Sequence, residues 1–152
     1  MSMISNNREM TEKLGRALAK QLQPGDTVLL DGPMGAGKSE LARGIARGLG
    51  VQGPVPSPSF TILNCYNEGT IPLFHFDWWR IGDESELYDI GAEEYVSGSG
   101  VCLIEWYQNG PSLVPEDVLR VRIVPLDDER REITLIPEGH FREITLKEDD
   151  IQ

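Results

Sequence analysis

The segment GPMGAGKS, residues 32–39, combines a flexible backbone with a cation and a hydroxyl, which together suit it to hold a chain of phosphates. It matches the pattern G-x-x-x-x-G-K-[ST] and lies between a short apolar run and a helical pattern, as that motif requires. Glycines let successive backbone N–H groups point at phosphate oxygens, and the following helix presents its positive end to the same anion. We therefore expect Lys38 to reach the β- and γ-phosphates of a nucleotide and the Ser39 hydroxyl to bind Mg²⁺.

Two acidic residues at the ends of predicted strands are candidates to meet that metal ion. Glu105 ends the apolar run VCLIE, and Asp77 follows LFHF in the stretch LFHFDWWRI. An ionised carboxylate among so many aromatic residues is costly to bury unless a cation meets it. If strand 71–76 lies beside the strand that precedes the phosphate loop, its C-terminal end opens onto the same crevice. Asp77 would then face the magnesium or the attacking water. Arg80 is expected either to face phosphate charge or to form a surface ion pair.

The charge balance limits what else the chain binds. Its 14 Lys and Arg residues stand against 25 Asp and Glu residues, a net charge of −11. This balance opposes direct capture of nucleic acid, which relies on basic residues displacing counterions. We therefore expect any role on RNA to run through another protein. The D-x-x-G and N-K-x-D patterns typical of GTPases are absent, which favours ATP over GTP.

Several features of the sequence indicate the compartment. The longest apolar runs are of strand length, too short to span a bilayer, and the first ten residues do not resemble a signal peptide. Cys65 and Cys102 each lie in an apolar, strand-like run, which predicts two buried reduced thiols rather than a disulfide or a metal pair. We expect a cytoplasmic protein with no membrane contact.

Hydrophobic periodicity supplies the elements that must position these residues. Helices are predicted at 11–22, 39–49 and 84–96, and strands at 27–31, 60–66, 71–76, 101–105 and 118–124, with 60–66 and 71–76 joined as a hairpin. This order predicts an α/β layer fold: a single P-loop NTPase domain over 1–152, with a mostly parallel central sheet flanked by helices. The near-repeat REITL, at 131–135 and 142–146, predicts a C-terminal antiparallel hairpin across a turn at 137–139, followed by an acidic tail.

Three smaller expectations concern packing. Gly44 and Gly48 would let helix 39–49 pack closely on the sheet. Helix 84–96 would bury Leu87, Ile90 and Tyr95. Trp78 and Trp79, adjacent on an extended segment, would point to opposite faces, so that at most one lies in the core.

Four separated patterns, occurring in this order, carry a family resemblance. They are GPMGAGKSELARG at 32–44, SPSF at 57–60, HFDWWRI at 75–81 with ELYDIGAEEY at 86–95, and LIEWYQNG at 103–110. Together they resemble the bacterial family of the tRNA threonylcarbamoyladenosine biosynthesis protein TsaE over about residues 8–125. The tail from 126 to 152 is not part of the likeness.

The resemblance implies a small Mg²⁺-dependent ATPase that hydrolyses ATP to ADP and phosphate, slowly without its partners. Those partners are the transferase of the pathway and its paralogue, which attach threonylcarbamoyl to the adenosine beside the anticodon of tRNAs reading codons that start with A. The ATPase would meet tRNA only indirectly. This agrees with the acidic charge of the chain.

The resemblance also implies residue roles. Lys38, Asp77 and Glu105 would be catalytic, and Glu105 would bind Mg²⁺ with Ser39, with Asp77 in the same active site and Trp106 beside it. The nucleotide would be held by Thr11, Met34, Gly35, Ala36, Gly37, Lys38, Ser39 and Arg130 (or its neighbour Arg131). Ser57 and Ser59 would belong to a mobile switch loop over the γ-phosphate. A tyrosine is usual in this family where Trp79 stands, so a phenol is lost here.

Two other function classes share the phosphate loop. A small-molecule kinase would need a substrate pocket, and the acidic stretch 82–100 suits a phosphate acceptor poorly. A nucleotide-sensing module would bind ATP without hydrolysing it and dock on a partner, for which helix 84–96 offers Tyr88 and Tyr95. Analysis of reaction products separates the kinase from the ATPase, and phosphate release with and without partners separates the sensing module.

Overall fold

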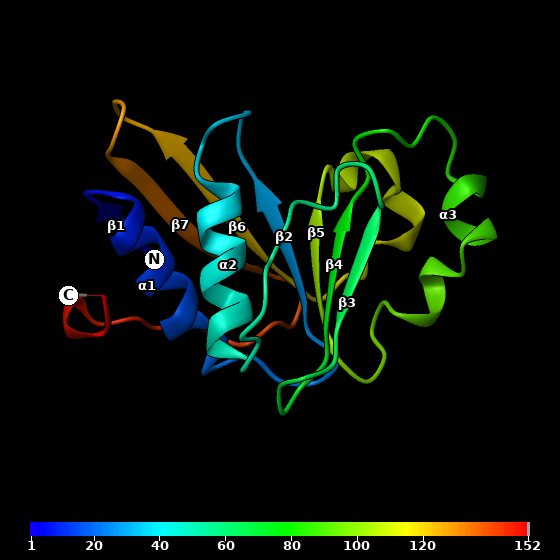
Figure 1. Cartoon of the computed structure of the whole chain (residues 1–152), viewed down its shortest axis with the longest axis horizontal. Coiled ribbons are helices and arrows are strands. Elements are labelled where there is room, and N and C mark those ends of the chain that lie inside the picture. The colour runs from blue at the N-terminus through cyan, green and yellow to red at the C-terminus, as the bar shows by residue number, and fades with distance from the viewer. Residues whose placement is uncertain (152) are drawn as a thin grey trace.

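A computed structural model describes residues 1–151 and shows a seven-stranded sheet with helices on both faces (Figure 1). Four short 3-10 turns, at Ala92–Glu94, Tyr107–Asn109, Pro111–Leu113 and Glu148–Asp150, accompany the main elements. Those elements are β1 (Ser2–Ser5), α1 (Arg8–Ala19), β2 (Thr27–Asp31), α2 (Lys38–Gly48), β3 (Leu63–Tyr66), β4 (Leu73–Asp77), α3 (Ser85–Asp89), β5 (Val101–Glu105), β6 (Val118–Pro125) and β7 (Arg131–Glu138).

The strand order is β1-β7-β6-β2-β5-β4-β3. The four central strands, β6, β2, β5 and β4, are mutually parallel, whereas β7 and β1 at one side and β3 at the other pair antiparallel. This confirms the predicted α/β fold with a mostly parallel centre. The condition considered for Asp77 is not met: β4 does not lie beside β2, the strand before the phosphate loop, because β5 lies between them. The carboxyl ends of all three strands still meet at one edge of the sheet.

Alternation along the strands divides the core in two. In β4, Leu73 packs into the core beneath α1 and α2, whereas Phe74 and Phe76 pack into the core beneath α3. In β5, Leu103 and Ile104 divide in the same way. Because side chains two apart share a face, the odd-numbered residues at the ends of both strands point toward α2. The acids at these ends are therefore on the face where the phosphate loop enters its helix.

The glycines of α2 are used differently from the prediction. They pack against α1 and not against the sheet: a Cβ on Gly44 would lie 2.1 Å from the backbone oxygen of Glu12, and one on Gly48 would lie 2.8 Å from that of Arg16. Gly15 of α1 makes the matching approach to α2, where its Cβ would be 2.5 Å from the backbone oxygen of Leu41. The two helices therefore touch through their backbones, which fixes the position of α2.

The C-terminal antiparallel hairpin is present, but its strands are not the ones predicted from the repeat. The first copy, 131–135, lies in β7, which pairs with β6 and β1. The second copy, 142–146, forms no strand. Instead its Ile144 and Leu146 are buried in the core beneath α1 and α2, and Arg142 pairs with Asp26, just before β2, at 2.6 Å. Because β7 is paired on one side with β6 and on the other with β1, no edge of it is left for the second copy.

Of three other predictions on packing, the one for the tryptophans is confirmed, and those for helix 84–96 and for the cysteines are partly corrected. Helix 84–96 is broken by Gly91 (φ 74°) into α3 and a 3-10 turn, and this break leaves Ile90 45% exposed while Leu87 is buried. Trp78 is fully buried and Trp79 is half exposed, as alternation predicted. Cys102 is buried but Cys65 is exposed, because β3 is an edge strand; both thiols are free.

Within residues 1–151, no helix has the length and apolar character needed to cross a lipid bilayer.

Candidate functional site

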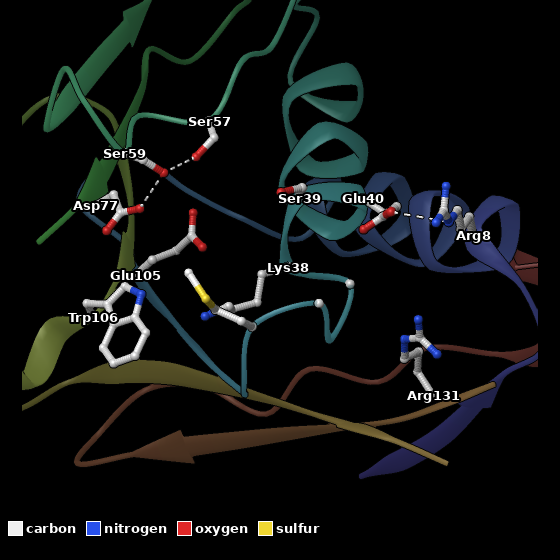
Figure 2. Close-up of a pocket in the computed structure, with 13 residues that line it drawn as sticks. Arg8, Lys38, Ser39, Glu40, Ser57, Ser59, Asp77, Glu105, Trp106 and Arg131 are labelled. Carbon is white, nitrogen blue, oxygen red and sulfur yellow. Dashed lines mark hydrogen bonds and ion pairs between the residues drawn. The ribbon is translucent and has the colours of Figure 1, made fainter. Parts of the chain in front are cut away.

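A cavity of about 300 Å³ opens where the ends of β4 and β5 face the start of α2 (Figure 2). Glycine backbone, three carboxylates, hydroxyls and three cationic side chains share it. It is lined by Arg8, Met34, Gly35, Gly37, Lys38, Ser39, Glu40, Ser57, Ser59, Asp77, Glu105, Trp106 and Arg131.

The loop after β2 has the geometry of an anion cradle. Gly35 and Gly37 have φ of 75° and 108°, values that a residue with a side chain rarely adopts. Gly37 is the N-cap of α2 and supplies no side chain to its first N–H groups, which therefore remain available to an incoming anion. Lys38 and Ser39 are the first two residues of that helix. The loop thus offers a positive helix end, a cation and a hydroxyl in one place.

Lys38 is nine-tenths buried and contacts an aromatic ring. Its Nζ lies 5.1 Å from the centroid of the Trp106 indole, within the range of a cation–π interaction. Trp106 has left-handed backbone angles (φ 55°, ψ 40°), so the chain turns sharply after Glu105 and brings the ring back over the cavity. Trp79 packs against Trp106 with ring centroids 4.7 Å apart. A left-handed backbone is costly for tryptophan, and strain of this kind is concentrated at functional sites.

Asp77 and Glu105 end neighbouring parallel strands in the same register. Both are buried, with exposed fractions of 5% and 7%, and both point into the cavity (Figure 2). Asp77 accepts hydrogen bonds from the backbone N–H of Trp79 at 2.9 Å and from Ser59 Oγ at 3.3 Å. Oε2 of Glu105 is 2.8 Å from His75 Nε2. In the described chain, neither acid has a Lys or Arg partner within 4 Å, so their negative charge is directed at the cavity.

These donors fit a magnesium ion. The ligand atoms on offer are the Ser39 hydroxyl and the two carboxylates, all of them oxygen, which Mg²⁺ prefers. No cluster of three or more acid, histidine or cysteine side chains forms a closed metal cage within residues 1–151. Mg²⁺ retains several waters and is usually bound by one or two carboxylates together with substrate phosphates. An open, oxygen-only site beside a phosphate loop meets that requirement.

The segment predicted as a switch loop closes the cavity on the side of Asp77. Ser57 Oγ and Ser59 Oγ are 2.7 Å apart, and the second of these reaches Asp77. Phe60 is 78% exposed, and the guanidinium of Arg80 lies 4.2 Å from its ring centroid. Arg80 therefore does neither of the two things expected of it: it lies outside the cavity, stacked on the end of this loop.

Two residues expected near the nucleotide, Thr11 and Arg130, do not line this cavity. The Thr11 hydroxyl is buried against Ser5 Oγ at 2.7 Å, where it ties α1 to β1. Arg130 pairs with Asp127 on the surface at 2.7 Å. Its neighbour Arg131 is the arginine that lines the cavity. Of the loop residues, Ala36 is fully buried and faces the core, while the other five line the cavity.

Arg131 adds positive charge to the phosphate loop. It is nine-tenths buried, and its guanidinium donates to the backbone carbonyls of Asp127, Asp128 and Arg130, with no carboxylate partner among the described residues. Its Nε would lie 3.5 Å from a Cβ placed on Gly37. Because its hydrogen-bond partners are neutral carbonyl groups, no carboxylate offsets the positive charge that Arg131 places beside the loop.

Arg8 and Glu40 also line the cavity and were missed from the sequence. Arg8 Nε lies 3.6 Å from Glu40 Oε1, and both residues line the cavity. The predicted helix began three residues too late to include Arg8. The available signal was Asn7, which caps α1 by accepting a hydrogen bond from the backbone N–H of Met10.

Comparison with known proteins agrees with this geometry. Residues 5–133 match the family model described as "Threonylcarbamoyl adenosine biosynthesis protein TsaE". The tRNA threonylcarbamoyladenosine biosynthesis protein TsaE of Bacillus subtilis is 41% identical over 142 residues, covering 93% of this chain and 89% of that protein. The Treponema pallidum protein of the same name is 38% identical over 135 residues, covering 89% and 99%. The crystal structure of Bacillus subtilis YdiB matches with a TM-score of 0.80 and 35% identity, covering 91% of this chain and 86% of that one. The chain belongs to the TsaE family.

Proposed function

We propose that this chain is a Mg²⁺-dependent ATPase that supports threonylcarbamoyl modification of the adenosine next to the anticodon in tRNAs reading codons that start with A. The observation that carries the proposal is the meeting of two buried strand-end acids, Asp77 and Glu105, with the phosphate loop in one cavity. The names of the relatives support the pathway, since the Bacillus subtilis and Treponema pallidum relatives are both called tRNA threonylcarbamoyladenosine biosynthesis protein TsaE.

The residues of the chain divide the chemistry among them. The N–H groups at the start of α2 and the Lys38 ammonium would neutralise charge that develops on the phosphates. Ser39 and Glu105 would hold Mg²⁺, which when bound polarises the phosphoryl oxygens. Asp77 would orient or deprotonate the attacking water, because it lies beside Glu105 and its Oδ1 and Oδ2 are fixed by two hydrogen bonds.

Nucleotide binding would also move Lys38. In the described structure its ammonium lies over the Trp106 ring. Contact with phosphate oxygens is stronger than contact with an indole face, since both partners are then charged. We expect Trp106 fluorescence to report binding for this reason.

Partner proteins would connect this cycle to tRNA. A chain with a net charge of −11 is a poor ligand for a phosphate backbone, so contact with tRNA would be indirect, through the transferase of the pathway and its paralogue. We infer that the protein acts in the cytoplasm, the compartment expected from its sequence.

A genetic test examines the proposed pathway. The gene is deleted, and threonylcarbamoyladenosine in total tRNA is quantified by mass spectrometry after complementation with wild type, Lys38→Ala or the surface variant Lys13→Ala. We expect the mark to return with wild type and Lys13→Ala but not with Lys38→Ala. A mark that persists in the deletion strain would contradict the pathway assignment.

A biochemical test examines the reaction. Purified protein is incubated with Mg²⁺ and ATP, with and without the partner proteins, and its products are separated. Free phosphate with no phosphorylated metabolite is the expected result, and its release should rise when partners are added. No release under either condition would favour a nucleotide-sensing module.

A further inference from the structure

A buried histidine, His75, contacts one of the two acids from within the sheet. It lies two residues before Asp77 in β4, so the two side chains share the face that points toward α2. The register pairs His75 with Leu103, which makes Glu105 its diagonal neighbour on that face. Nε2 of His75 is 2.8 Å from Oε2 of Glu105, and the His75 side chain is only 3% exposed.

The direction of this hydrogen bond follows from the chemistry of the two groups. An ionised carboxylate only accepts, so His75 Nε2 carries the hydrogen and donates it to Glu105. The other ring nitrogen, Nδ1, is buried and has no hydrogen-bond partner within residues 1–151. An unpaired buried polar atom costs stability, and an apolar side chain of similar size would avoid that cost. Core packing therefore does not account for an imidazole here, whereas a fixed donor toward Glu105 does.

We propose that His75 is a positioning residue that aims Glu105 at the metal ion. Its N–H holds Oε2, which leaves Oε1 of Glu105 free of any hydrogen bond in the described chain and close to the cavity. A glutamate has three side-chain torsions, and without this bond its carboxylate would sample other rotamers. The inference rests on the proposed function, since it assumes that Glu105 binds Mg²⁺. Groups that hydrogen-bond a metal ligand commonly change metal affinity 10- to 100-fold when removed.

The test compares two amides at position 75. In His75→Gln the amide nitrogen stands near the position of Nε2 and keeps a donor toward Glu105. In His75→Asn it stands near Nδ1 and loses that donor. The same change at the other histidine, His140→Asn, is the control, because the His140 side chain is 95% exposed and lies outside the cavity. Glu105→Gln is measured in parallel.

The readout is binding and not turnover. The affinity of each protein–ADP complex for Mn²⁺ is measured from the electron paramagnetic resonance signal of free Mn²⁺, and ADP affinity is measured separately in EDTA. We expect His75→Asn to lose at least about 10-fold in Mn²⁺ affinity with unchanged ADP affinity in EDTA. His75→Gln and His140→Asn should bind Mn²⁺ like wild type.

Two contrary results have different meanings. If His75→Asn binds Mn²⁺ normally while Glu105→Gln does not, the positioning role is wrong and the metal role of Glu105 stands. If Glu105→Gln also binds normally, that metal role fails, and the inference about His75 fails with it.

A second measurement needs no variant at position 75, in case His75→Asn does not fold. The chain has only two histidines, so a long-range ¹H–¹⁵N spectrum of the wild-type imidazoles is easily assigned. We expect the buried histidine to be protonated at Nε2 and its resonances to shift in Glu105→Gln. A hydrogen on Nδ1 alone would overturn the proposal.

Discussion

Asp77→Asn should stabilise the metal-free protein while weakening its response to magnesium. Asp77 and Glu105 are buried, end adjacent parallel strands in the same register, and have no Lys or Arg partner within 4 Å in the described chain. Adjacent strands are about 4.8 Å apart. Asparagine keeps the shape of Asp77 and both of its hydrogen bonds, since its carbonyl accepts from Trp79 and its amide donates to Ser59. The substitution thus removes a charge and little else.

The size of the effect follows from that spacing. Two unit charges about 5 Å apart repel by roughly 3 kcal/mol at an effective dielectric constant of 20. Water in the open cavity and the nearby Lys38 ammonium reduce this, so we expect a gain of about 1 kcal/mol in the free energy of unfolding. In a chain of this length that raises the midpoint of thermal unfolding by about 2–4 °C.

The assay is thermal unfolding in EDTA and again with Mg²⁺ and ADP. Wild type should gain stability from Mg²⁺–ADP, by about 2.7 kcal/mol at 100 times the dissociation constant. Asp77→Asn should gain less, because it removes a negative charge beside Glu105, the proposed ligand of the metal ion. Asp89→Asn on the exposed surface of α3 controls for the change in net charge. An Asp77→Asn protein that melts below wild type in EDTA, or that gains as much from Mg²⁺–ADP, would refute the reasoning.

Three further predictions test other parts of the structure. Lys38→Ala should weaken ATP binding about 10- to 100-fold by calorimetry, because a charge-assisted hydrogen bond contributes about 1.5–3 kcal/mol; an unchanged affinity would reject the phosphate assignment. Gly44→Ala should lower the unfolding midpoint despite the better helix propensity of alanine, because its Cβ would meet a backbone oxygen of α1 at 2.1 Å. Gly82→Ala, whose Cβ meets nothing closer than 3.9 Å, is the control, and equal midpoints for the two variants would contradict the close contact. Iodoacetamide at pH 8 should label exposed Cys65 before Cys102, because burial raises the pKa of the Cys102 thiol to about 12; equal rates in the folded protein would count against its burial.

The parts of the site that local patterns specify could be predicted from the sequence. The loop motif and its flanks placed Lys38 and Ser39, and the apolar strands ending in acids placed Asp77 and Glu105. Each signal lies within a few residues of the side chain that it predicts. The carboxyl ends of parallel strands meet at one edge, so the convergence of the acids followed from the fold class even though β4 is not the direct neighbour of β2.

The parts that depend on distant pairing could not be predicted. Strand β1 has only four residues and exists because it pairs with β7, 130 residues later, a contact for which its own sequence carries no signal. The pairing of β7 with β6 rather than with 142–146 has the same origin. Arg80 illustrates a third case, because its contact with Phe60 depends on the path of a loop rather than on a regular element.

The central claim is that a magnesium-bound triphosphate lies in this cavity, with its metal held between α2 and the strand-end acids. A crystal structure with Mg²⁺ and a non-hydrolysable ATP analogue tests it most directly. We expect Mg²⁺ about 2.1 Å from Ser39 Oγ and the carboxylate of Glu105 bound to it or to one of its waters, with Asp77 beside the γ-phosphate. Phosphates seated outside the loop, or both carboxylates turned away from the metal, would contradict the account.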